Sequence, residues 1–296
     1  MRNEIYTREW RWIEQLSAAF HVFSANISSV LKVMAVIFLP ISLVGVLISD
    51  RMLTAYTLFQ QIIPAGDTTA HVDASLLMDT TYQILINYGL LYMVSLFLEP
   101  VGVIAIAKMV KQYIDGKEIS MGEALSESFS LMPGIIVTGI IYGGLVFLGS
   151  MIVIPGIYLS IAWGFYLFAM GLSGKKGWDA LKYSKSLVKG KWWRTFGYFW
   201  LLSIIAILWN SVFELICSFA PEGIAGDMLY QFLCYFSAAF AAVGETLLFI
   251  NREAITFGAQ PGTVASGGEA ESEPAEPVEG TMEGEPAEQE EEKDRK

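Results

Sequence analysis

The chain has 296 residues, of which 54% are hydrophobic and only 17% are charged, and its mean hydropathy is +0.48. So few polar side chains cannot cover a water-soluble globule of this length, and the composition therefore excludes a soluble globular protein. The formal net charge is −11. Residues 258–296 hold twelve acidic and three basic side chains, so the rest of the chain carries a net charge of only −2.

The first predicted element is an amphipathic helix within residues 1–26. The segment WIEQLSAAFHVF places Trp12, Leu16, Phe20 and Phe23 on one helical face. A secretory signal would begin with a short basic stretch and a compact apolar core, whereas the first sixteen residues are charged and aromatic throughout. We therefore expect a cytoplasmic interfacial helix followed by a retained membrane span.

Six apolar segments are long enough to cross the hydrocarbon layer, which takes about 20 helical residues. They define a six-span membrane domain at residues 27–257 of an all-α integral membrane protein. The third and fourth spans are joined by a Pro-Gly turn in VIPGIYLS and are expected to form a hairpin. The predicted spans are Ile27–Ser49, Tyr82–Ala107, Leu131–Val153, Ile157–Leu172, Thr195–Cys217 and Met228–Ile250.

The distribution of lysine and arginine predicts the orientation of these spans. Short cytoplasmic loops are enriched in basic residues. One set of connections, which includes both ends of the membrane domain, holds fourteen basic residues, whereas the opposite set holds only Arg51. Both termini are therefore expected in the cytoplasm, and the protein is expected to be a multi-pass protein of the bacterial cytoplasmic membrane.

Amphipathic segments precede the first, third and fifth spans, and each has an acidic residue two positions before an aligned leucine. We predict that all three segments are cytoplasmic helices that lie in the membrane interface. A three-fold hairpin repeat explains the pattern, and so does chance similarity among amphipathic helices. The aligned pairs are Glu14 with Leu16, Glu123 with Leu125 and Asp179 with Leu181.

Two carboxylates within the predicted spans, Glu99 and Glu245, lie at a similar depth on the cytoplasmic side of the membrane centre. Pro100 disfavours helical geometry at Glu99, and Pro40 interrupts the first span. Broken helices at membrane depth can form solute or ion sites. One hypothesis is therefore an intramembrane polar site of Glu99, Pro100 and Glu245 facing a shared cavity. The alternative is that each carboxylate pairs locally, Glu99 with the backbone or Lys108 and Glu245 with Thr246 or Asn251.

The stretch GWDALKYSKSLVKGKWWR combines lysines with tryptophans in the most basic cytoplasmic connection. Indole rings favour the headgroup layer, and lysines near the surface attract anionic lipids. The stretch is predicted either to bind anionic headgroups of the cytoplasmic leaflet or to act only as a topology signal. The candidate lipid-facing residues are Trp178, Lys182, Lys185, Lys189, Trp192 and Trp193.

Residues 258–296 are predicted to form a disordered acidic cytoplasmic tail. Their Glu-Pro and Gly repeats have no apolar periodicity and cannot bury enough surface to fold.

From Ile152 to Leu202 the sequence resembles the bacterial membrane-domain family found with some glycerophosphodiester phosphodiesterases and in stand-alone membrane proteins of unknown function. The resemblance implies a membrane domain and contributes little chemistry. Where the family usually has a glutamate before the Gly-Lys loop, this chain has Ser173. The matching residues are Pro155, Gly156, Ile157, Tyr158, Ala180, Leu181, Ser184, Gly190, Trp192 and Trp193.

No nucleotide-binding loop, nucleophile elbow or metal-ligand cluster is found in the sequence. We therefore expect no enzyme activity, no cofactor, no metal and no nucleic-acid partner. The expected function is that of a scaffold or a protein of lipid and envelope homeostasis that acts through its basic interfacial helices. The alternative is a transporter of a small solute or lipid headgroup that uses Glu99 and Glu245. The sequence does not define an oligomeric state.

Overall fold

A computed structural model of the protein describes residues 4–62, 74–219 and 223–258. These residues are helical apart from short connections, with no strand among them. The predicted C-terminal tail lies outside the described residues except for Gly258, which ends the last helix with a positive φ of 68°.

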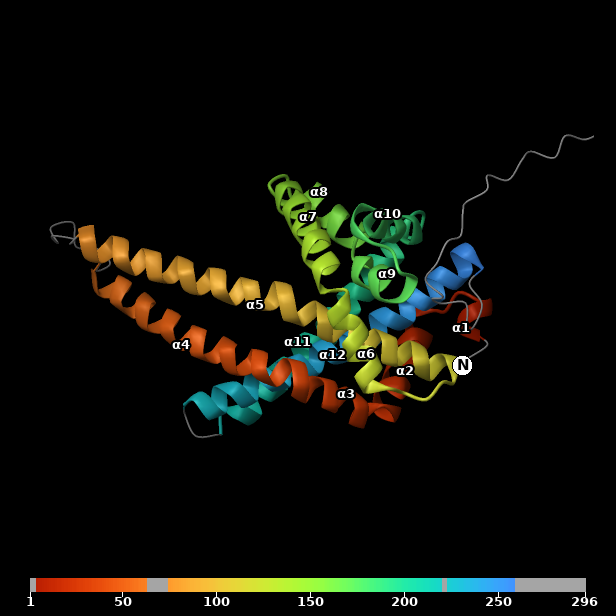
Figure 1. Ribbon diagram of the computed structural model, residues 1–296, viewed down its shortest axis with the longest axis horizontal. Coiled ribbons are helices and arrows are strands. Elements are labelled where there is room, and N and C mark those ends of the chain that lie inside the picture. The colour runs from red at the N-terminus through yellow and green to blue at the C-terminus, as the bar shows by residue number, and fades with distance from the viewer. Residues whose placement is uncertain (1–3, 63–73, 220–222, 259–296) are drawn as a thin grey trace, which may run out of the picture. The chain divides into compact units, whose positions relative to one another are not determined.

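The helices follow the chain in the order shown in Figure 1. Their bounds are α1 Glu4–Thr7, α2 Trp12–Ala25, α3 Ile27–Val33, the π-helical segment η1 Met34–Phe38, α4 Leu39–Ile62, α5 Ala74–Asp115, α6 Met121–Ser130, α7 Met132–Ser150, α8 Ile154–Ala162, α9 Tyr166–Ser173, α10 Gly177–Val188, α11 Trp192–Cys217 and α12 Ile224–Phe257.

Within the described ranges, six helical runs are long and apolar enough to span a membrane, which confirms the number of spans predicted from the sequence. Length and composition thus indicate a multi-pass membrane protein. The second and sixth runs extend well beyond the segments predicted for them. The six runs are Ile27–Leu53, Ser75–Asp115, Met132–Ser150, Ile154–Ser173, Trp192–Cys217 and Ile224–Phe257.

The prolines in the first two spans have different effects. Helix α5 continues unbroken through Pro100, so the predicted loss of helical geometry at Glu99 is wrong. Val101 and Ile104, which follow this proline, are fully buried, and their packing offsets the local cost of the proline. In the first span, η1 ends two residues before Pro40, and a wider π turn is a common accommodation in a strained helix.

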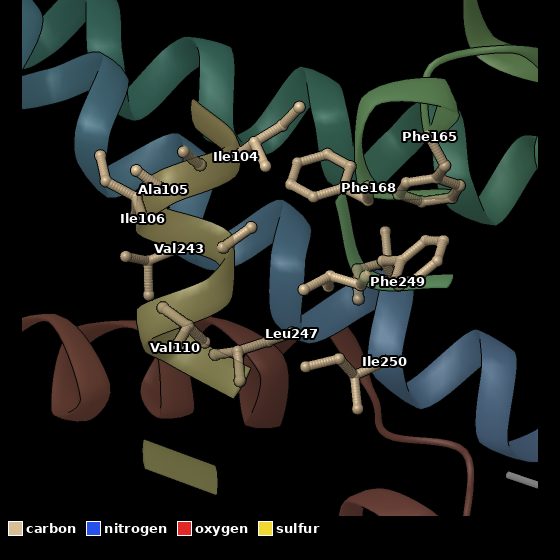
Figure 2. Packing of buried hydrophobic residues seen from close by; sticks show 14 of the residues in the cluster. Ile104, Ala105, Ile106, Val110, Phe165, Phe168, Val243, Leu247, Phe249 and Ile250 are labelled. Atoms are coloured by element: carbon tan, nitrogen blue, oxygen red, sulfur yellow. The ribbon is translucent and has the colours of Figure 1, made fainter. Parts of the chain in front are cut away.

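The hydrophobic core lies where the end of α5, the α9 region and the second half of α12 meet (Figure 2). Ile104 and Val110 come from α5, Phe168 from α9, and Val243 and Leu247 from α12; all five side chains are at most 3% exposed. Aromatic contacts extend this packing, since Phe168 lies 5.9 Å from Phe249 between ring centroids. This core anchors α9 and, through it, the following helix α10.

Helix α2 packs against both α11 and α12. The ring of Phe20 lies 4.6 Å from that of Phe240 and 6.2 Å from that of Trp209, measured between centroids. Phe23 contacts the Phe236 ring at 5.1 Å. The apolar face predicted for this helix therefore contributes partly to the protein core, although Phe20 is still 43% exposed.

The N-terminal segment is fastened to the end of α12 by one amide side chain. Asn251 donates hydrogen bonds to the carbonyl oxygens of Ile5 and Arg8, both at 2.8 Å, and accepts one from the Trp10 amide at 3.2 Å. Asn251 is fully buried, so these bonds satisfy polar groups that water does not reach.

Candidate functional site

Helix α10 presents one apolar face to the protein and one basic face outward. Leu181 and Val188 are buried, whereas Lys182, Lys185 and Lys189 are exposed. Asp179 lies in the first turn, where its negative charge interacts favourably with the positive end of the helix dipole. After Val188 the chain reverses through Gly190, whose φ of 77° is a conformation that favours glycine.

A break in the fourth apolar segment fixes the position of α10. This segment was predicted as one continuous span, but residues 163–165 interrupt it between α8 and α9. The Ser184 hydroxyl of α10 donates to the Ala162 carbonyl and accepts from the Phe165 amide, each at 3.0 Å. Since Ser184 is fully buried, this hydroxyl satisfies backbone groups that the break would otherwise leave unpaired.

A pocket of about 180 Å³ lies beside the basic face of α10, and we call it the α10 pocket. It combines two ammonium groups with two aromatic rings and the glycine turn. The pocket is lined by Tyr158, Ala162, Lys185, Val188, Lys189, Gly190 and Trp192.

The aromatic wall of the α10 pocket is held rigidly. The Trp192 ring stacks on Tyr158 with a centroid distance of 6.0 Å and on Phe196 at 5.3 Å. Its indole Nε1 donates a hydrogen bond of 3.3 Å to the Tyr158 carbonyl. The indole therefore ties α8 to the start of α11 and forms a fixed surface next to the lysines.

The charges of the α10 pocket are not neutralised within the described part of the chain. Lys185 and Lys189 form no salt bridge there, whereas Lys182 lies 4.0 Å from Asp179. Two uncompensated ammonium groups beside aromatic rings can bind an anionic group such as a phosphodiester.

A second charged cluster includes Lys191, which directly follows the pocket residue Gly190 in the sequence. The Glu9 carboxylate forms salt bridges with Lys191 at 3.0 Å, Arg194 at 2.9 Å and Arg252 at 2.5 Å. Burial acts to raise the pKa of Glu9, but the hydrogen bond from Lys191 and the charges of the two arginines outweigh it and lower the pKa. Glu9 thus holds the N-terminal segment, the start of α11 and the end of α12 together.

The other predicted lipid-facing tryptophans lie outside the α10 pocket. Trp178 packs edge-on against Trp163 of the break at 5.9 Å and is 47% exposed. Trp193 is 76% exposed and contacts the edge of Trp192 at 4.7 Å. The structure therefore brings Lys185, Lys189 and Trp192 into one pocket and leaves Trp178, Lys182 and Trp193 on the surrounding surface.

Glu99 has two hydrogen-bond partners, one on its own helix and one on α12. Its Oε1 accepts hydrogen bonds from Ser95 at 2.9 Å and from Tyr235 of α12 at 2.8 Å. Lys108, one of the partners considered from the sequence, pairs instead with Glu127. Glu99 therefore ties α5 to α12.

Glu245 lies in different surroundings. It lines a pocket of about 410 Å³ between α7, α8, α11 and α12, and Glu99 does not line this pocket. Neither Thr246 nor Asn251 pairs with Glu245, because Thr246 bonds to the Ala242 carbonyl and Asn251 holds the N-terminal segment. The pocket around Glu245 is therefore not shared with Glu99.

Several residues of these sites were not identified as site residues from the sequence. Ser184 and Tyr158 were noted only as matches to the resembling family, and Glu9 carried no signal because its three cationic partners are distant in sequence. Glu253, also unpredicted, accepts hydrogen bonds from Ser173 and from Tyr183, the latter at 2.6 Å. Ser173 therefore pairs with an acidic residue of α12.

Comparison with family models, with curated proteins and with solved structures found no match for this chain. Within the described ranges, no group of three His, Cys, Asp or Glu side chains is arranged to hold a metal ion.

Proposed function

We propose that the protein is a non-enzymatic multi-pass protein of the bacterial cytoplasmic membrane that binds an anionic phospholipid headgroup in the α10 pocket. The observation that carries this proposal is the convergence of Lys185 and Lys189 with the fixed ring of Trp192 in one pocket. Its function would be to organise or respond to envelope lipids.

The size of the α10 pocket supports a headgroup as its ligand. At about 180 Å³ it is smaller than sites for whole small molecules, which enclose roughly 300–1,000 Å³. A phosphate and its ester linkages would enter the pocket, while the acyl chains remain in the bilayer. The exposed Trp193 beside it suits the headgroup layer.

The charge distribution supports a cytoplasmic position for this surface. The connection that contains α10 is the most basic in the chain, as expected of a cytoplasmic loop. The short helices α2, α6 and α10 each precede a long apolar helical run, and this order supports the proposal that they are interfacial helices of repeated hairpins. The resemblance to the membrane-domain family agrees with a role in the membrane rather than in catalysis.

Native mass spectrometry of the protein released from gently solubilised membranes tests the proposal. Wild type is expected to retain a defined anionic phospholipid, and a variant with Lys182, Lys185 and Lys189 all changed to alanine is expected to lose it. If wild type retains no lipid selectively, the lysines are topology signals and the proposed binding function is wrong.

A further inference from the structure

The pocket around Glu245 differs in chemistry from the α10 pocket. Four helices and the break in the fourth apolar segment form its walls, and its volume is about 410 Å³. None of its lining residues is a lysine, arginine or histidine. They are Tyr142, Ser160, Ile161, Gly164, Phe199, Leu202, Ser203, Ala206, Ala241 and Glu245.

The Glu245 carboxylate has no hydrogen bond or ion pair among the described residues. In contrast, Glu9 and Glu99 each have partners within the chain. Glu245 stands twelve residues before the end of α12, which is about 18 Å along a helix, and so lies well inside the apolar run. An unpaired charge at such a position is costly, so a carboxylate retained there calls for a proton or a cation from outside the chain.

The remaining groups around the pocket favour a cation. The hydroxyls of Ser160 and Ser203 donate to their own helices, both at 2.9 Å, so their oxygens are left as acceptors towards a ligand. Tyr142 and Phe199 supply aromatic rings, whose faces attract ammonium groups. The pocket thus joins a carboxylate, hydroxyl acceptors and aromatic rings.

One further polar group beside the pocket lacks a partner. The Tyr198 hydroxyl is fully buried and has no hydrogen-bond partner in the part of the chain that the structure describes, although nearly all buried polar groups in proteins have one. It lies next to Gly244, where a built Cβ would be 3.1 Å from the hydroxyl oxygen. The hydroxyl thus lies beside the residue that precedes Glu245, and the described residues satisfy neither this hydroxyl nor the Glu245 carboxylate.

We propose that the Glu245 pocket binds a small organic cation with a primary or quaternary ammonium group, with Glu245 as its counter-ion. The site is independent of the α10 pocket, because it takes a ligand of opposite charge and shares no lining residue with it. The ammonium group belongs either to a free amine or to a lipid headgroup.

Protection of Glu245 from a hydrophobic carbodiimide, which modifies carboxyl groups within membranes, tests this site. The full chain is placed in nanodiscs of phosphatidylglycerol alone, and labelling of Glu245 is followed by peptide mass spectrometry. Choline and ethanolamine are titrated as probes, with 3,3-dimethylbutanol as the uncharged counterpart of choline. We expect the two amines to reduce labelling at least tenfold more effectively than the alcohol.

Variants separate binding from stability. Glu245→Gln should fold, since it removes an unpaired charge. In wild type the amines should raise the thermal midpoint, and in Glu245→Gln the apparent affinity measured from this rise should be at least tenfold weaker. Glu99→Gln removes a paired intramembrane carboxylate and should leave that rise unchanged. Ser203→Leu fills the pocket while keeping Glu245, and should abolish protection by the amines.

The same labelling experiment is repeated with phosphatidylethanolamine in place of part of the nanodisc lipid, to decide whether the ammonium group belongs to a lipid or to a free amine. Protection by this lipid but not by free ethanolamine assigns a headgroup site, and protection by the free amines assigns a solute site. Protection by sodium alone, equal protection by the neutral alcohol, or an unchanged thermal response in Glu245→Gln would overturn the proposal. Loss of lipid binding in the α10 pocket would leave this result unaffected.

Discussion

The hydroxyl of Ser184 lies 3.0 Å from the amide nitrogen of Phe165 and accepts its hydrogen bond. Through this bond α10 is joined to the break between α8 and α9, and the lysines of its basic face are held at a fixed position relative to Tyr158. The proposed headgroup pocket therefore depends on a buried serine that does not itself line the pocket.

Ser184→Ala is expected to lower the free energy of unfolding by about 2 kcal/mol, because two buried backbone groups lose their only side-chain partner. The thermal midpoint in a fixed detergent measures the change. Ser186→Ala is the matched control, since the Ser186 hydroxyl bonds locally to the Tyr183 carbonyl on the same helix. Equal midpoints for the two variants would contradict the bridging role of Ser184.

Glu9→Gln is expected to destabilise the protein by about 3 kcal/mol, because Arg252, which is only 1% exposed, loses its counter-charge. Glu14→Gln is the control: Glu14 pairs with the exposed Arg8, and such surface pairs contribute little. The two thermal midpoints are compared with that of wild type at neutral pH. A fall no larger for Glu9→Gln than for the control would exclude a central role for this cluster.

The pH dependence of stability follows from the lowered pKa of Glu9. A carboxylate whose pKa is lower in the folded state stabilises the protein fully above its ordinary pKa of 4.5. That contribution is lost as the pH falls through the folded value. Wild type should therefore lose stability more steeply than Glu9→Gln when the pH is lowered from 5, and parallel curves would show that Glu9 contributes nothing.

Two glycines of the α7–α8 hairpin are expected to respond in opposite directions to alanine. At Gly156 a Cβ would lie 2.6 Å from the Cα of Ser150, so Gly156→Ala forces the two helices apart and should cost about 2 kcal/mol or more. At Gly144 a Cβ meets nothing within 4 Å, and Gly144→Ala should gain about 0.5 kcal/mol from helix propensity. Thermal midpoints of both variants check the signs, and destabilisation by both would show that the hairpin packing is different.

The membrane spans could be predicted from the sequence because their length and apolar composition are local properties. Each predicted segment, from Ile27 onward, overlaps an apolar helical run of the structure. The break at residues 163–165 could not be predicted in this way, because the surrounding sequence IAWGFYLF is apolar throughout. Its backbone groups are satisfied by Ser184, a contact between distant residues that no hydropathy pattern encodes.

The candidate sites show the same division. The lysines and tryptophans of α10 are visible as a basic and aromatic stretch, but the part that Tyr158 takes in the pocket follows from the packing of α8 against the start of α11. Glu99 and Glu245 share a predicted depth in the membrane, but depth alone does not define towards which neighbouring helix each side chain points. The structure turns Glu99 towards Tyr235 and Glu245 towards a separate pocket.

The most direct test of headgroup binding is a phosphatidylglycerol titration of two charge-matched double variants, followed by native mass spectrometry. Lys185→Ala/Lys189→Ala removes the pocket lysines, whereas Lys176→Ala/Lys182→Ala removes two exposed lysines outside the pocket. At about 1 kcal/mol for each lysine, the pocket variant should bind the first lipid about 30-fold more weakly than wild type. The control variant should keep that first bound lipid with a clearly smaller loss, whereas equal weakening in both variants would mean that the lysines act only through their general charge and that the α10 pocket is not a binding site.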